Sequence, residues 1–256
     1  MRISSDQSEF ADANVLPLSV AGRALFLDVD GTLIDIAASP DSVIVPGTLA
    51  GDLRGASLKV GGALALVSGR TIETVDRLLH PETFPVAGLH GGEFREPGGV
   101  SVQLPTPPAL ATYRPLIAQL AERFSGVHIE DKGRAIAVHY RAVPSAGEEV
   151  ERAVEEMAAT SGDTLATQKG KMVIELKPID AGKGVAVARF MSSPPFAGRL
   201  PIAIGDDITD EEMFRIVNAL GGLSVRVGTP DRPSEALQYI ESPEAVRNWL
   251  ASIESG

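Results

Sequence analysis

The stretch ALFLDVDGTLIDIA, residues 24–37, places two carboxylates directly after a short apolar run. The run ends at Leu27, Asp28 and Asp30 follow with one residue between them, and a glycine and a threonine come next. Like charges at this spacing repel each other, so the pair becomes favourable where a bound divalent cation supplies the opposing charge. A helix cap or an Asx-turn is the more ordinary role for a single aspartate at a strand end. The pairing therefore raises the hypothesis of a metal site.

The composition is that of an ordinary soluble protein with a real core, since 44% of the 256 residues are hydrophobic and 22% are charged. The net charge of -11 argues against a general nucleic-acid binder, because binding to the phosphate backbone needs a basic surface. The absence of cysteine excludes disulfides and thiolate metal sites. No segment has the apolar core of a secretory signal or the roughly 18–20 apolar residues of a membrane span. We expect a cytoplasmic monomer that binds neither nucleic acid nor membrane.

The fold class is indicated by short apolar runs that each stop at a polar loop. The four runs are residues 24–27 before DVDG, 63–67 before SGR, 85–89 before HGGE and 200–204 before GDD. Helical spacing between them, as over 71–79, is typical of a parallel sheet covered on both faces. Ligands of such sheets bind beyond the carboxyl ends of the strands. The sequence therefore predicts an α/β core in which the four polar loops converge.

The middle of the chain has a different pattern. PTPP at 105–108 and KPIDAG at 177–182 look like linkers, and the segment between them contains strand-like and helical stretches. The predicted strands are 127–132, 135–141, 163–167 and 171–177, with an acidic helix near 145–160. We interpret 109–178 as an inserted α+β domain with an antiparallel sheet, and 1–108 with 179–256 as the core. A strand at 224–227 and a last helix, with Ser242 as its N-cap, complete the core.

The side chains at the strand ends suit phosphoryl transfer. Asp28 can attack phosphorus to give an aspartyl-phosphate, and Asp30 can protonate the leaving oxygen and later deprotonate water. Ser68 offers a hydroxyl to a phosphoryl oxygen, and Lys183 at a helix start offers a compact positive charge. Helix capping is an equally good explanation for either of these loops alone. Four such loops in this order are much harder to explain by capping.

Carboxylates for a divalent metal come from the fourth loop, GDDITD. Asp206 and Asp207 are suitable ligands for Mg²⁺, which prefers oxygen donors. Asp210 and Thr209 follow at a spacing that would steady those ligands. With Asp28, the two loops supply an acidic set for one cation. Gly31 allows backbone N–H groups to approach the phosphoryl oxygens.

These motifs resemble those of the haloacid dehalogenase superfamily of phosphotransferases: DVDGT is similar to its first motif, Ser68 to its second, Lys183 to its third and GDDITD to its fourth. The resemblance implies a Rossmann-like haloacid dehalogenase core with an inserted α/β cap. It implies Asp28 as nucleophile, Asp30 as general acid/base, and Ser68 and Lys183 as catalytic residues. Mg²⁺ would be held by Asp28, the Asp30 carbonyl and Asp206, with Asp207 as a further ligand or a partner of the ligands. The motif residues assigned to the substrate are Gly31, Thr32, Ser68, Gly69 and Arg70.

The predicted cap strands alternate in a way that bears on the substrate. One face is apolar, through residues such as Ile136, Met172 and Ile174. The other carries acids, bases and two histidines: His128, Glu130, Lys132, His139, Arg141, Lys171, Glu175 and Lys177. A sheet face that is simply exposed to solvent would show the same pattern of polar residues. The mixture of donors and acceptors also suits a polyhydroxylated ligand, since each sugar hydroxyl both donates and accepts.

The segments GLHGGE, EDKGRAIAVHYR, GKMVIELKP and GDDITDEEMF resemble the trehalose-6-phosphate phosphatase family, in its order. That resemblance implies a Mg²⁺-dependent hydrolysis of trehalose 6-phosphate to trehalose and phosphate, the last step of trehalose biosynthesis. The positions that would bind the sugar are His90, Gly91, Glu130, Lys132, Arg134, His139, Arg141, Lys171 and Glu175. The alternatives are another sugar-phosphate phosphatase, a phosphosugar mutase of the same superfamily, or a non-catalytic sugar-phosphate sensor. A sensor would be expected to lose Asp28 or Asp30.

Overall fold

Two sheets organise the chain in the computed structural model, which describes residues 16–36, 43–79, 84–170, 172–229 and 231–254. The larger sheet contains β1 (Arg23–Leu27), β2 (Leu64–Val67), β3 (Val86–Gly88), β4 (Glu93–Arg95), β5 (Ser101–Gln103), β10 (Leu200–Gly205), β11 (Leu223–Val227) and β12 (Gln238–Ile240). Its order is β12-β11-β10-β1-β2-β3-β4-β5. The strands from β12 to β3 are parallel, and β4 and β5 add an antiparallel edge. The predicted α/β core is confirmed.

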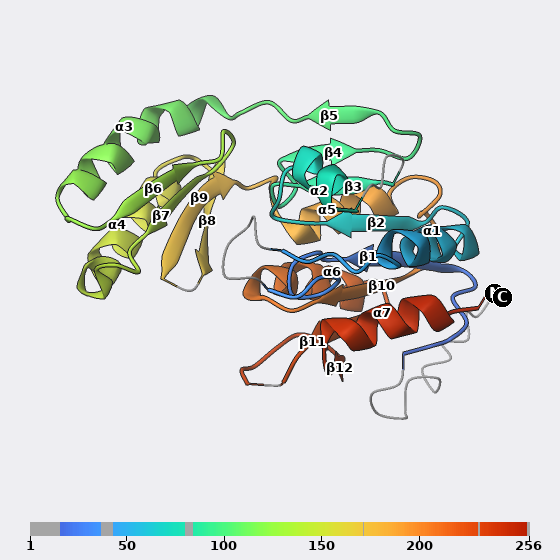
Figure 1. Ribbon diagram of the computed structural model, residues 1–256. Helices are drawn as coiled ribbons and strands as arrows, with labels where there is room; N and C mark the ends of the chain where they lie inside the picture. The colour runs from blue at the N-terminus through green and yellow to red at the C-terminus, as the bar shows by residue number, and fades with distance from the viewer. Residues whose placement is uncertain (1–15, 37–42, 80–83, 171, 230, 255–256) are drawn as a thin grey trace.

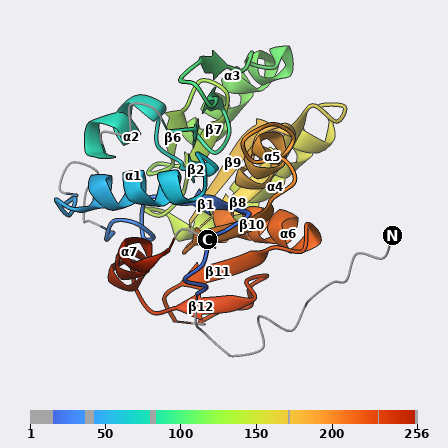
Figure 2. The ribbon, with the colours of Figure 1, turned by 90° about the vertical axis from the view of Figure 1, so that its right-hand side faces the viewer.

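The central strands are apolar without alternation because helices cover both faces of the sheet. Every residue of β2 is buried, as are residues 24–27 of β1. The covering helices are α1 (Leu49–Lys59), α2 (Ile72–Leu79) and α7 (Pro243–Ser252) on one face, and α5 (Lys183–Met191) and α6 (Glu211–Ala219) on the other (Figure 2). The Ser242 side chain accepts a hydrogen bond from the Ala245 amide at 3.2 Å, so the predicted cap of the last helix is confirmed.

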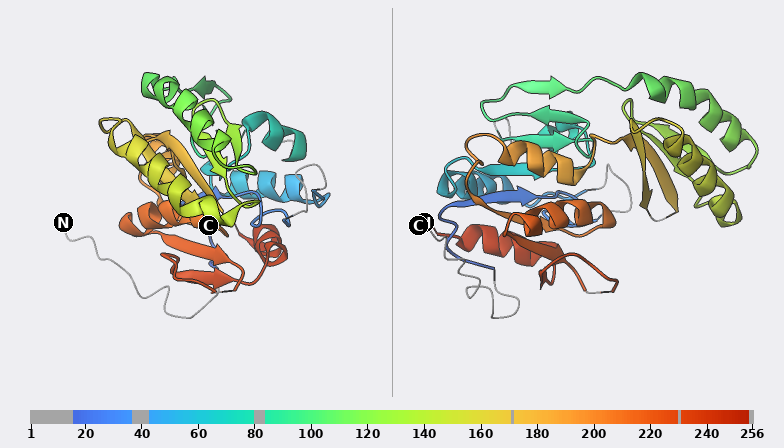
Figure 3. Two further views of the ribbon diagram at one scale, coloured as in Figure 1. Left: turned by 90° about the vertical axis from the view of Figure 1, so that its left-hand side faces the viewer. Right: turned by 180° about the vertical axis from the view of Figure 1, so that it is seen from behind.

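The second sheet belongs to a unit that we call the cap, residues 108–178. It contains β6 (His128–Asp131), β7 (Ile136–His139), β8 (Leu165–Gly170) and β9 (Val173–Pro178), all antiparallel in the order β6-β7-β9-β8. Helices α3 (Pro108–Glu122) and α4 (Gly147–Ala159) pack on one face and form a separate hydrophobic cluster with it. The cap projects from the end of the core (Figures 1 and 3). The exact domain boundaries, 108/109 and 178/179, stay a prediction.

The structure differs from the predicted strands in three places. The short strands β4, β5 and β12 were not predicted, because their sequences EFR, SVQ and QYI mix polar and apolar residues and form no apolar run like the one at 85–89 that predicted β3. Strand β8 runs on to Gly170, beyond the predicted end at 167. Met172 was wrongly placed on the apolar face: it lies in the turn between β8 and β9 with φ 60° and is 40% exposed. Gly170 pairs with Val173, so the intervening turn is too tight for Met172 to continue the strand.

None of the helices in the described ranges is long and apolar enough to cross a membrane.

Candidate active site

A buried ion pair joins the first and third predicted motifs. Asp28 follows β1 directly, and Lys183 is the first residue of α5. The Lys183 ammonium lies 2.6 Å from Asp28 Oδ1 and 2.7 Å from Asp210 Oδ1, and all three side chains are at most 5% exposed. Burial alone would lower the pKa of Lys183, but Asp210 and Asp28 outweigh it and raise that pKa, so the ammonium stays charged.

Asp28, Asp206 and Asp210 form an acidic triad. Each offers a carboxylate oxygen, and these three atoms lie within 4.8 Å of one another. Asp210 Oδ2 accepts hydrogen bonds from the amides of Asp206 and Asp207, both at 3.0 Å. Since its Oδ1 accepts from Lys183, Asp210 organises the loop, while Asp28 and Asp206 are the acids better placed to bind a cation.

Burial and the neighbouring charges raise the pKa of two of these acids, Asp28 and Asp206. Burial raises the pKa of Asp28 well above its usual range; Lys183 opposes the shift, and Asp210 and Asp206 add to it. Burial, then Asp210 and Asp207, raise the pKa of Asp206 to about 6. All the donors are carboxylate oxygens, the ligand type that Mg²⁺ prefers. The triad therefore fits a hard divalent cation, whose charge would offset this repulsion.

Gly31 lets the loop after β1 touch the loop after β10. Its φ of +78° suits glycine, and a β-carbon there would clash with the Asp206 carboxylate. The buried Thr32 lies next to it, with Oγ1 3.4 Å from Asp206 Oδ1. The two loops meet because β1 and β10 are parallel neighbours, with Leu27 opposite Ile204.

The loop after β2 contains Arg70, whose side chain binds Asp30, the second aspartate of the first loop. Arg70 donates from Nε and Nη2 to the two oxygens of Asp30, each at 2.6 Å. The Arg70 amide donates to Oγ of the fully buried Ser68 at 3.1 Å. Sequence reasoning assigned Arg70 to the substrate; in the structure its guanidinium fixes the Asp30 carboxylate by a bidentate pair, which specifies direction as well as distance.

The loop after β3 brings His90 to the same place. The His90 ring lies against Gly69, where a β-carbon would be 2.6 Å from Nε2. Burial, with Lys183, Lys132 and Lys177, lowers the pKa of His90 to about 3, so this imidazole is neutral at pH 7. Its Nδ1 is buried without a hydrogen-bond partner among the described residues. The neighbouring Gly91 packs on the second linker, where a β-carbon at Gly91 would lie 3.1 Å from the Gly182 carbonyl oxygen.

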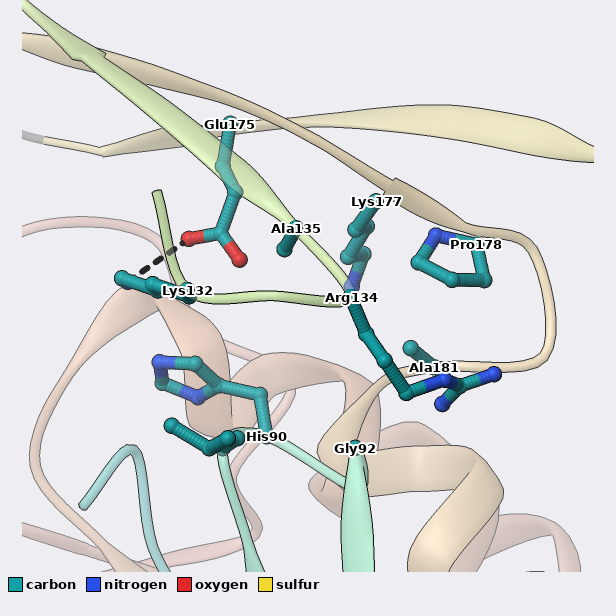
Figure 4. Close-up of a pocket in the computed structure, with 10 residues that line it drawn as sticks. His90, Gly92, Lys132, Arg134, Ala135, Glu175, Lys177, Pro178 and Ala181 are labelled. Carbon is teal, nitrogen blue, oxygen red and sulfur yellow. Dashed lines mark hydrogen bonds and ion pairs between the residues drawn. The ribbon is translucent and has the colours of Figure 1, made fainter. Parts of the chain in front are cut away.

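The polar face of the cap sheet lies opposite these loops. Lys132 pairs with Glu175 at 3.0 Å (Figure 4), and His139 Nε2 lies 3.1 Å from Glu130 Oε2. A cleft between cap and core is lined by His90, Lys132, Ala137, His139, Arg141, Gln168, Lys169, Gly170, Val173, Glu175, Asp207 and Thr209. Residues from the cap and from two core loops thus share one space.

Several predicted site residues lie differently. Arg134 does not line this cleft: its guanidinium donates to the Pro105 carbonyl at 3.0 Å and to Asp180 at 3.1 Å, so it contacts both linkers. Asp207 lies outside the triad, with a carboxylate that is 59% exposed and 3.7 Å from Arg232. Lys171 lies outside the described residues.

Two lining residues, Gln168 and Lys169, were missed by sequence reasoning. Both belong to β8, whose predicted end at 167 stopped just before them. A longer strand would have placed Gln168 opposite Glu175, on the polar face, and so among the candidates.

The core, the cap and the four converging loops together form a haloacid dehalogenase-like fold. A solved haloacid dehalogenase-like hydrolase from Bacteroides thetaiotaomicron has the same fold, with a TM-score of 0.65 at 15% identity over 91% of this chain and 99% of that one.

The chain belongs to the trehalose-phosphatase family. The model of that family matches residues 26–243. A relative named probable trehalose-phosphate phosphatase, from Sinorhizobium fredii, is 50% identical over 90% of this chain and 87% of its own. The trehalose-6-phosphate phosphatase of Escherichia coli is 41% identical over 91% and 87%. The protein is accordingly an enzyme that hydrolyses phosphoric monoesters, with a small phosphosugar as substrate.

Proposed function

We propose that the protein hydrolyses trehalose 6-phosphate to trehalose and phosphate through an aspartyl-phosphate on Asp28, as the last step of trehalose biosynthesis. The observation that carries the proposal is the buried Asp28–Lys183 pair of 2.6 Å, which also binds Asp210 of the loop whose Asp207 and Thr209 line the cleft with donors and acceptors of the cap. The names of the close relatives support the same substrate.

The chain's own residues account for both halves of the reaction. Asp28 attacks phosphorus, the bond from phosphorus to the sugar O6 breaks, and Asp30 delivers a proton to that oxygen. Asp30 then takes a proton from water, whose oxygen attacks phosphorus and releases phosphate and free Asp28. Arg70 orients the ionised Asp30 by donating to both of its oxygens, and one of these two hydrogen bonds has to open when Asp30 carries the proton. Lys183 stabilises negative charge beside the nucleophile.

Mg²⁺ is the proposed cofactor. Asp28, Asp206 and the Asp30 carbonyl would hold it, with Asp207 as a further ligand or a partner of the ligands. When bound, it would neutralise part of the charge on the carboxylates and on the dianionic phosphoryl group. Ser68, with the amides of Thr32 and Gly69, would contact the phosphoryl oxygens, whereas the Gly31 amide already donates to the Ile34 carbonyl at 2.8 Å.

Replacing either cap acid by alanine should separate sugar recognition from chemistry. Glu175→Ala removes an acceptor that lines the cleft, and Glu130→Ala removes one on the same cap face outside that lining, so kcat/KM for trehalose 6-phosphate should fall about 10–100-fold. Hydrolysis of p-nitrophenyl phosphate, which has no sugar, should change little. The measurement is phosphate release from a panel of sugar phosphates and from the aryl ester.

The matched control is Glu156→Ala, an exposed acid of α4, the helix that packs on the apolar face of the cap sheet. A parallel loss on both esters would assign the acids to the fold or to cap closure. A wild-type preference for another sugar phosphate would refute the trehalose assignment, and activity that depends on a bisphosphate activator would indicate a mutase.

Replacing Asp30 by Asn should reduce the rate of hydrolysis most for esters with a poor leaving group. Loss of a general acid typically costs on the order of 10²–10⁴ in rate. The deficit on trehalose 6-phosphate should therefore exceed that on p-nitrophenyl phosphate, whose leaving group needs little protonation. Single-turnover rates on both esters measure it, with Asp35→Asn, a 69%-exposed acid of the same stretch, as control. Equal deficits would make Asp30 a structural residue.

A further inference from the structure

We propose that Gln168 is a sugar-binding donor that determines specificity, and that Lys177, held by Glu212 of the core, is the positioning residue that aims it. The inference rests on the proposed function, because it names a further contact for the phosphosugar in the same cleft.

Gln168 belongs to the same cross-strand row as the acids Glu175 and Glu130 of the polar cap face. The pairing of the strands places Gln168 opposite Glu175, Glu175 opposite Ala137, and Ala137 opposite Glu130. These residues project on the same side of the sheet, since neighbours directly across a sheet share a face. Gln168 is half-buried and lines the cleft together with Glu175 and Ala137.

Lys177 fixes which end of the Gln168 amide faces the cleft. Lys177 is buried, and its ammonium donates to Gln168 Oε1 and, at 3.0 Å, to Glu212 Oε1. An ammonium has only donors, so it must face the amide oxygen and turn the NH₂ group away from itself. Within the described ranges, no residue accepts a hydrogen bond from Gln168 Nε2. The two N–H donors are therefore free to bind a hydroxyl or ether oxygen.

The Lys177–Glu212 pair crosses from the cap to the core. Glu212 lies in the first turn of α6, directly after the GDDITD loop, and Lys177 lies near the end of β9. The pair fills the space beside Gly182, where a β-carbon would clash with the Glu212 carboxylate and lie 3.3 Å from Lys177 Nζ. A carboxylate of the core thus binds the ammonium (Lys177 is drawn in Figure 4), and the ammonium in turn orients the cap amide.

The test is a double-mutant cycle between Gln168 and Lys177. Gln168→Met keeps the length of the side chain and removes the donors, so the KM for trehalose 6-phosphate should rise about 10–100-fold with little change in kcat. Gln168→Glu, which can still accept from Lys177, should lose the same contact. Lys177→Met should produce a similar rise, and the double variant should be no worse than Gln168→Met, because Lys177 acts through Gln168. Glu212→Gln weakens the hold on Lys177 and should give a smaller rise.

The controls separate recognition from folding. Gln119→Met makes the same substitution at an exposed position of α3 and should leave both esters unaffected. Hydrolysis of p-nitrophenyl phosphate should be unchanged in every Gln168 variant. Wild-type KM in Gln168→Met, or a parallel loss on the aryl ester, would overturn the role of Gln168. Additive effects in the cycle would overturn that of Lys177.

Failure of the proposed function can be distinguished from failure of the role proposed for Gln168. If the wild-type enzyme prefers another sugar phosphate, the same variants are measured on that ester. A KM rise there would keep Gln168 as a sugar donor while the trehalose assignment falls.

Discussion

The Asp28→Asn variant should release no phosphate from trehalose 6-phosphate or from p-nitrophenyl phosphate. The carboxamide is a far weaker nucleophile than the carboxylate, and removal of a catalytic nucleophile typically costs on the order of 10⁶ in kcat. The loss should be the same for both esters, because Asp28 acts on phosphorus rather than on the sugar. The equal loss on both esters distinguishes Asp28→Asn from every cap substitution, which should affect only the sugar phosphate.

The variant should nevertheless fold. Lys183 keeps Asp210 as a partner at 2.7 Å, so its buried ammonium is not left unpaired. Burial and the neighbouring acids already make a charge on Asp28 unfavourable, and a neutral amide of the same shape relieves that cost. Thermal unfolding of Asp28→Asn and of the control Asp35→Asn checks this point. Acid-quenched wild-type enzyme should carry a covalent phosphate that Asp28→Asn lacks, and substantial turnover by the variant would refute the nucleophile.

Removing divalent cations should abolish turnover, and Mg²⁺ should restore it. One carboxylate oxygen from each of Asp28, Asp206 and Asp210 lies within 4.8 Å of the other two. A dianionic phosphoryl group would add further negative charge. Lys183 is already shared between two of these acids, so it cannot neutralise the whole set. Productive binding therefore needs a further cation.

Two measurements check the metal independently of each other. EDTA should reduce phosphate release below detection, with recovery on adding excess Mg²⁺. Calorimetry should detect Mg²⁺ binding to the substrate-free enzyme, weakened in Asp206→Asn and unchanged in Asp35→Asn. Full activity of the chelated enzyme would contradict the proposed cofactor, and equal Mg²⁺ affinity in Asp206→Asn would remove Asp206 from its site.

The sequence by itself determined the fold class and the meeting of four loops. Apolar runs such as residues 63–67 report burial on both faces, and a parallel sheet brings the ends of such strands to one edge. That reasoning needs only local patterns and one rule of topology. It placed Asp28, Ser68 and Asp206 in one region although they are far apart in the chain. Lys183, which begins a helix, was assigned to the same site by the resemblance of its motif, and the structure joins it to Asp28 at 2.6 Å. The N-cap Ser242 was equally readable, since capping is a local interaction.

Only the tertiary structure decided how the charged side chains pair. Arg70 holds Asp30, Arg134 contacts both linkers, and Lys177 joins Gln168 to Glu212. The partners are separated by nine to 46 residues along the chain, and their alternation shows only which face they share. Long cationic side chains can reach several carboxylates from one backbone position, so the choice depends on the packing of the cap against the core. A periodic pattern contains no information about that packing.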